Sequence, residues 1–182
     1  HNNGSMLQTL ALQYILKNRY ELDIEIIDFS NAGQRNMYSV FPKADNIRRL
    51  IKNIIWVTQY KQIKKQYNSY NAFIKKYFQL TPKEYICSND LKELDVAYDA
   101  VIAGSDQVWN ICCRDADDAY YLNFLKNTPK YGYAISFGAN NPFEIDGDCS
   151  IHKDLVSQFS RVSVREKNAQ KWIFDALNMY VP

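Results

Sequence analysis

Ala103-Gly104-Ser105-Asp106-Gln107-Val108-Trp109-Asn110 is the stretch of this 182-residue sequence that decides its fold. It follows the short apolar run at residues 98–102, which is typical of a buried strand. Ligands of open α/β sheets lie outside the carboxyl ends of the strands. Small and hydrogen-bonding residues at such a place therefore indicate a binding site more than a core.

Helical and strand patterns alternate on both sides of this stretch. Such alternation predicts an α/β fold, with a largely parallel sheet flanked by helices. We expect helices at residues 6–18, 44–78 with a break near Thr58, 91–94, 151–159 and 166–178. We expect strands at residues 22–29, 100–103, 130–137, 162–164 and, opening near the end, 180–181, with a loop at residues 31–42.

Composition excludes several classes of protein. Hydrophobic residues make up 47% of the chain, as in globular proteins, and the net charge of +2 does not indicate nucleic-acid binding. The four cysteines form no C-x-x-C pair and only two histidines are present, so we predict no metal site and reduced thiols. No apolar run is long enough to span a bilayer and no signal peptide is visible.

Each polar residue after the central strand has two interpretations. Asp106 can accept hydrogen bonds from sugar hydroxyls or act as a base, or it can simply cap the next turn. Ser105 and Gln107 share its position after the strand. Trp109 can stack on a sugar ring, or it can fill the core, which is the commoner fate of tryptophan.

Two further places suit an anionic ligand. Gly4-Ser5 opens the first helix, whose free N–H groups attract anions, although an ordinary N-cap explains the same residues. Arg165 follows the predicted strand at residues 162–164, where a guanidinium can hold a carboxylate or phosphate. The alternative is a salt bridge to a neighbouring acid such as Glu166.

Residues 43–78 carry nine Lys and Arg but one acid, Asp45. A solvated helix face is the favoured interpretation. The alternative is a patch for an anionic polymer or an anionic membrane surface.

Three motifs in this order resemble the polysaccharide pyruvyl transferase family. They are N-N-G-S-M-L-Q-T-L-A-L-Q at residues 2–13, D-A-V-I-A-G-S-D-Q-V-W-N at residues 99–110 and S-V-R-E-K at residues 163–167. Residues 131–138, Y-G-Y-A-I-S-F-G, are similar to the family's strand after the second motif.

The resemblance implies transfer of a pyruvyl group from phosphoenolpyruvate to two hydroxyls of a sugar, with no metal or cofactor. It makes Asp106 and Arg165 the catalytic candidates. It makes the following residues candidates for substrate binding: Asn3, Gly4, Ser5, Gln8, Gly104, Ser105, Gln107, Trp109 and Ser136. The acceptor is then a sugar or a lipid-linked oligosaccharide of bacterial surface or exopolysaccharide synthesis.

The resemblance also implies an architecture of two Rossmann-like domains facing a cleft, as in GT-B glycosyltransferases. Residues 1–182 correspond to the N-terminal domain, with a basic helical excursion at about 44–78. We expect a strand before residue 1 and a second domain after residue 182, and therefore little turnover by this part alone.

Two other functions remain open on the sequence. One is a GT-B-like glycosyltransferase that uses a nucleotide-sugar, and the other is a non-catalytic glycan-binding or assembly module. We expect a cytoplasmic location and no nucleic acid as partner. Peripheral contact of the basic helix with the inner face of the membrane is the alternative to a solvated helix face.

Overall fold

The computed structural model describes residues 3–41, 43, 46–144 and 150–182. The chain divides into two compact units, His1–Ile86 and Cys87–Pro182. Each unit is described by itself.

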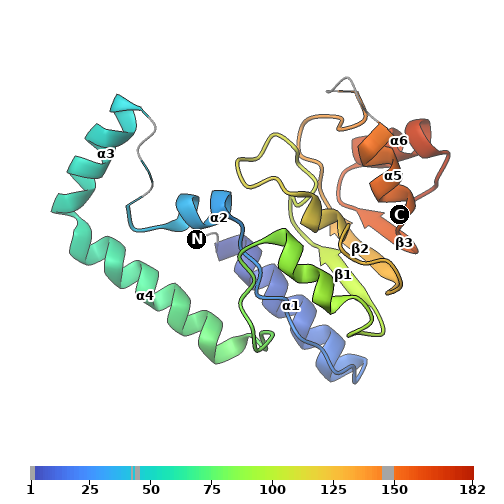
Figure 1. Cartoon of the computed structure of the whole chain (residues 1–182), viewed down its shortest axis with the longest axis horizontal. Helices are drawn as coiled ribbons and strands as arrows, with labels where there is room; N and C mark the ends of the chain where they lie inside the picture. Colours follow the sequence, from blue (N-terminus) through green and yellow to red (C-terminus); the bar gives the residue numbers. More distant parts are fainter. Residues whose placement is uncertain (1–2, 42, 44–45, 145–149) are drawn as a thin grey trace. The chain divides into compact units, whose positions relative to one another are not determined.

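A three-stranded parallel sheet forms the centre of the second unit (Figure 1). Its strands are β1 (Val101–Gly104), β2 (Lys130–Ile135) and β3 (Arg161–Val164), in the order β1-β2-β3. Parallel neighbours need crossover connections, and the chain supplies them through a 3₁₀-helix, η2 (Asp118–Tyr121), and a helix, α5 (Ser150–Ser157). This confirms the predicted mixed α/β fold and three of its strands, within one or two residues at each end.

Apolar side chains from the sheet and its helices make the core of this unit. Leu155 and Val156 of α5 are buried, as are Ala169 and Ile173 of α6 (Lys167–Leu177). The two residues of α5 are adjacent and the two of α6 lie about one helical turn apart, so each helix buries one apolar face. The largest buried side chains of the unit include Trp109, Phe137, Leu91, Leu125 and Ile135.

The pairing of β2 with β3 is irregular between Gly132 and Ile135. Ala134 has a φ of 48° there, and its N–H turns out of the regular ladder. The Oγ of Ser163 accepts a hydrogen bond from that N–H at 2.9 Å. The serine of the third sequence motif thus replaces a missing strand contact.

A carboxylate joins the segment before β1 to the segment before β2. Asp95 follows the 3₁₀-helix η1 (Ser88–Leu94) and accepts hydrogen bonds from the N–H groups of Asn127 and Thr128, at 3.0 and 3.2 Å. The backbone bond from Asn127, with those from its neighbours, lowers the pKa of Asp95 to about 2. The short helix predicted at residues 91–94 is present as the second half of η1.

Four helices make up most of the first unit: α1 (Asn3–Arg19), α2 (Ala32–Tyr38), α3 (Ile47–Thr58) and α4 (Tyr60–Tyr77). The predicted break near Thr58 is confirmed, at Gln59. Gln13 of α1 donates to the carbonyl of Tyr77 and accepts from the N–H of Gln79, both at 2.8 Å. One amide side chain thereby ties α1 to the end of α4.

Three predictions of local structure are wrong. Residues 22–29 form no ladder and make two isolated parallel bridges, Ile26 to Leu80 and Phe29 to Tyr85. The predicted loop at residues 31–42 contains α2, because the side chain of Asn31 caps its first turn by accepting from the N–H of Gln34. Residues 180–181 form no strand.

Candidate functional site

The loops that follow the three strands are hydrogen-bonded to one another. The N–H of Ser136, after β2, donates to the carbonyl of Asp106, after β1, at 3.0 Å. The N–H of Arg165, after β3, donates to the carbonyl of Ile135, at the end of β2, also at 3.0 Å. The second and third sequence motifs therefore meet at one edge of the sheet, where α/β folds bind ligands.

Asp106 and Arg165 form an ion pair at this edge. Nη1 of Arg165 lies 3.8 Å from Oδ1 of Asp106, and the two side chains are 40% and 34% exposed. The same carboxylate oxygen accepts from the N–H of Gln107 at 2.9 Å. At this distance and exposure the pair is weak, so the guanidinium can turn to an anionic ligand with little loss of free energy.

Glu166 is the neighbouring acid that the sequence offers as a partner for Arg165. Glu166 makes no ion pair with Arg165 in the described part of the chain. It occupies the N-cap position of α6 without a side-chain capping bond, and its Oε2 is buried without a hydrogen-bond partner there. The carboxylate that faces Arg165 thus comes from the second motif, which sequence spacing does not reveal.

Gly104 ends β1 beside the backbone of Tyr133 in β2. Its φ is 134°, and a Cβ at this position would lie 2.0 Å from the carbonyl oxygen of Tyr133. Only glycine allows both the backbone angle and the approach. Gly104 therefore positions the loop that begins with the partly buried Ser105.

The amide of Asn110 holds that loop from its other end. Its Nδ2 donates to Oε1 of Gln107 at 3.1 Å, and its Oδ1 accepts from the N–H of Cys112 at 3.1 Å. A Cβ on Gly138, whose φ is 72°, would lie 2.5 Å from that Nδ2. Asn110 closes the G-S-D-Q-V-W-N motif, but its place in the sequence gives no reason to expect this role.

Trp109 and Ser136 are both fully buried. Nε1 of Trp109 donates to the carbonyl of Tyr120 at 3.0 Å, and its ring stacks on Tyr121 with centroids 4.9 Å apart. The Oγ of Ser136 accepts from the N–H of Gly138 at 3.1 Å. Trp109 therefore takes its core interpretation, although its ring also forms part of the wall of the cavity described below, and Ser136 supports the loop after β2.

The first motif lies in the other unit, at the start of α1. Asn3, Gly4 and Ser5 belong to the first turn of the helix, which therefore begins before residue 6, where the sequence predicts its start. Oδ1 of Asn3 accepts from the hydroxyl of Tyr70, the carbonyl of Ser5 accepts from Thr9 at 3.0 Å, and Gln8 is half-buried. The structure brings Asp106, Ser136 and Arg165 together, whereas these α1 residues are described only within their own unit.

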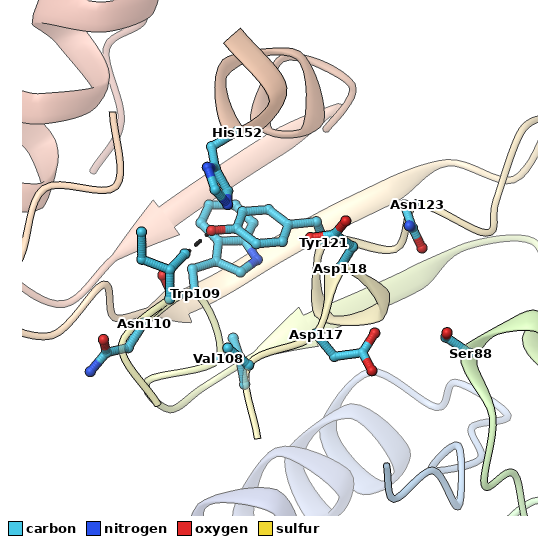
Figure 2. A pocket seen from close by; sticks show the side chains of 11 residues that line it. Ser88, Val108, Trp109, Asn110, Asp117, Asp118, Tyr121, Asn123 and His152 are labelled. Atoms are coloured by element: carbon cyan, nitrogen blue, oxygen red, sulfur yellow. Dashed lines mark hydrogen bonds between the residues drawn. The ribbon is translucent and has the colours of Figure 1, made fainter. Parts of the chain in front are cut away.

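A cavity of about 400 Å³ adjoins the loop after β1 (Figure 2). Its wall comes from the loop itself, from the start of η1, from η2 and the residues around it, and from α5. The ring of Tyr121, which lines the cavity, packs against the rings of both Trp109 and His152. Burial, with the nearby carboxylate of Asp118, raises the pKa of the Tyr121 hydroxyl well above its usual range.

The described residues contain no group of three or more His, Cys, Asp or Glu that is placed to hold a metal ion. Cys87, Cys112 and Cys113 are free thiols, while Cys149 lies outside the described residues. In the same part of the chain, no helix combines the length and apolar character needed to span a membrane.

Comparison with known protein families identifies a match. The model of the family described as polysaccharide pyruvyl transferase matches residues 2–180, nearly the whole chain. Comparisons with curated proteins and with solved structures give no match. The match spans all the motifs that meet at the sheet edge as well as the motif that opens α1, and the chain therefore belongs to the polysaccharide pyruvyl transferase family.

Proposed function

We propose that this protein takes part in transfer of a pyruvyl group from phosphoenolpyruvate to two hydroxyls of a sugar in a polysaccharide or its precursor. The observation that carries the proposal is the pairing of Arg165 with Asp106 at the carboxyl edge of the sheet, in a member of this family. A cation and a hydrogen-bond acceptor side by side suit an anionic donor and a hydroxyl-bearing acceptor.

The reaction requires neither an oxidant nor a reductant. One sugar hydroxyl adds its oxygen to C2 of phosphoenolpyruvate while C3 gains a proton and becomes a methyl group. A second hydroxyl replaces the phosphate on C2, which leaves as inorganic phosphate with the remaining proton. The product is a cyclic ketal that keeps the carboxylate of the donor.

Two side chains have roles in this proposal. Arg165 holds the carboxylate or phosphate of phosphoenolpyruvate, and the donor then replaces the weak contact to Asp106. Asp106, with Gln107 beside it, accepts the hydrogen bond of the attacking hydroxyl and is the candidate to take its proton. The reaction uses no cofactor.

The proposal includes the two-domain, GT-B-like architecture that the family resemblance implies. Residues 1–182 then supply one wall of a cleft and bind substrates weakly by themselves, because turnover requires groups on both sides of the reacting atoms.

The test is pyruvyl transfer by the complete gene product, supplied with phosphoenolpyruvate and glycans that carry neighbouring free hydroxyls. We expect phosphate release that depends on the glycan, and a new ketal methyl signal in the proton NMR spectrum of the product. Thermal stabilisation by a nucleotide-sugar but not by phosphoenolpyruvate, without phosphate release, would instead support a glycosyltransferase.

We further propose that α3 and α4 contact an anionic membrane surface. In α3, Ile47, Leu50, Ile51, Ile54, Ile55 and Val57 are each more than half exposed, and they share one side of the helix at 100° per residue. Residues 46–83 contain no Asp or Glu. An exposed apolar stripe in a cationic, acid-free segment is the pattern of a helix that lies in the membrane interface.

Sedimentation with phosphatidylcholine vesicles, with and without phosphatidylglycerol, tests this contact. We expect binding to the anionic vesicles that is lost in Ile54→Asp and weakened by neutralising Lys61, Lys64 and Lys65 together. Ile151→Asp, at a half-exposed isoleucine of α5, is the control that should bind normally. Concentration-dependent dimerisation without vesicle binding would assign the same face to a second copy of the chain.

A further inference from the structure

The cavity beside the loop after β1 is lined by polar side chains that have no hydrogen-bond partner among the described residues. Ser88, Asp118, Asn123 and His152 line it, and none of these four side chains makes a hydrogen bond within the described part of the chain. Nδ1 of His152 is buried as well as unpaired. Ser88, Asn123 and His152 are half-buried, and polar groups in such places are usually satisfied, so these three point to a ligand or to water. Asp118 is exposed and adds a carboxylate to the same wall.

The other polar residues of the wall contrast with these four. The carboxylate of Asp117 accepts from the N–H of Ala119 at 2.9 Å and so begins η2. The amide of Asn110 is held by Gln107 and Cys112. The wall therefore combines side chains fixed by the fold with four that are free to bind (Figure 2).

The chemistry of the wall favours an uncharged ligand with several hydroxyls. A carboxylate accepts hydrogen bonds, whereas a hydroxyl, an amide and a neutral imidazole each donate and accept. Among the described residues, no Lys or Arg lines the cavity, while two carboxylates do. A phosphate or carboxylate ligand would be repelled there, but a sugar that presents vicinal hydroxyls finds both donors and acceptors.

The cavity is also connected to the proposed reaction centre through a short stretch of chain. Residues 106–110 begin at the carboxylate that faces Arg165 and end at the asparagine in the cavity wall. The volume of the cavity, about 400 Å³, lies within the range of small-molecule sites, about 300–1,000 Å³. A saccharide held in it lies next to the loop that carries Asp106.

We propose that this cavity is a subsite for a neutral sugar unit of the acceptor, separate from the cationic place that Arg165 provides for the donor. The proposal rests on the proposed function for the identity of the acceptor. It assigns recognition of sugar hydroxyls to Asp118, Asn123, Ser88 and His152, which no sequence motif singles out.

Binding and kinetics of two variants test the subsite. Saturation-transfer NMR with methyl glycosides of glucose, galactose, mannose and N-acetylglucosamine, without phosphoenolpyruvate, measures binding that needs no turnover. We expect at least one glycoside to bind the wild-type protein and to bind Asp118→Asn and Asn123→Ala about tenfold more weakly, because each loses a hydrogen bond to the ligand. In the transfer reaction, the KM for the acceptor should rise by a similar factor while the KM for phosphoenolpyruvate stays within about twofold.

Asp154→Asn, on the exposed side of α5, is the matched control and should bind the glycosides normally. If no glycoside binds, or if all three variants bind like the wild type, the subsite is refuted. If the glycosides bind and the two variants lose that binding, but no pyruvyl transfer occurs, the subsite stands and the proposed function fails. Unchanged KM values for the acceptor beside normal transfer overturn only the subsite.

Discussion

Nη1 of Arg165 lies 3.8 Å from Oδ1 of Asp106, although the two residues follow β3 and β1, the two outer strands of the sheet. The end of the central strand β2 links the two loops: the N–H of Ser136 donates to the carbonyl of Asp106, and the N–H of Arg165 donates to the carbonyl of Ile135. The pair is therefore held by three backbone segments, while its own electrostatic attraction is weak at this exposure.

Replacing Arg165 should impair use of the donor without unfolding the protein. We expect Arg165→Ala to lower kcat/KM for phosphoenolpyruvate by about 10- to 100-fold, the loss typical of hydrogen bonds to a charged group. Arg165→Lys keeps the charge but not the planar fork, so its effect should be intermediate. Arg161→Ala, at the exposed start of the same strand, is the control for which steady-state kinetics should be unchanged. Normal kinetics in Arg165→Ala would remove this residue from the donor site.

Adding a methyl group at Gly104 should destabilise the second unit. The new Cβ would lie 2.0 Å from the carbonyl oxygen of Tyr133, at a φ of 134° that side chains rarely adopt. We expect Gly104→Ala to cost about 3 kcal/mol or more, measured by urea unfolding. Gly33→Ala makes the same change inside α2 and should leave the protein as stable or slightly more so, by about 0.5–1 kcal/mol. Equal stability of the two variants would contradict this account of the strand end.

Substitution of Trp109 separates its two interpretations. As a fully buried side chain it should cost about 3–5 kcal/mol when replaced by alanine. Trp109→Phe keeps an aromatic ring but loses the hydrogen bond to the carbonyl of Tyr120, and we expect a cost of about 1–3 kcal/mol with an unchanged KM for the acceptor. A rise in that KM with little loss of stability would return Trp109 to the role of a sugar-stacking platform.

Acid should weaken the connection made by Asp95. Its pKa is lowered from the ordinary value of 3.8 to about 2, so the carboxylate contributes stability above about pH 4, and this is lost as the pH falls toward 2. We expect urea midpoints of the wild-type protein to fall across this window. Asp95→Asn should have a lower midpoint above pH 4 and a flatter dependence below it. Asp99→Asn, at an exposed aspartate nearby, should follow the wild type.

Local sequence predicted those elements whose pattern is set by neighbours along the chain. The apolar spacing of α4 and α6 and the break between α3 and α4 are local features, and so are the short apolar runs of β1 and β3. The strand expected at residues 22–29 failed for the opposite reason. Its side chains favour a strand, but a ladder needs a partner over several residues, and Leu80 and Tyr85 supply single bridges.

For the candidate site, too, sequence order determined some features and tertiary contacts determined others. The sequence by itself determined that Asp106 and Arg165 follow strands, that the chain is α/β, and to which family it belongs, because motifs and periodicity are properties of order along the chain. Only the tertiary structure decided that Asp106 faces Arg165 in place of Glu166, that Trp109 is buried, and that Ser88, Asp118, Asn123 and His152 share one cavity. These are contacts between residues distant in sequence, and parallel strand pairing together with the irregularity of β2 sets which of them meet.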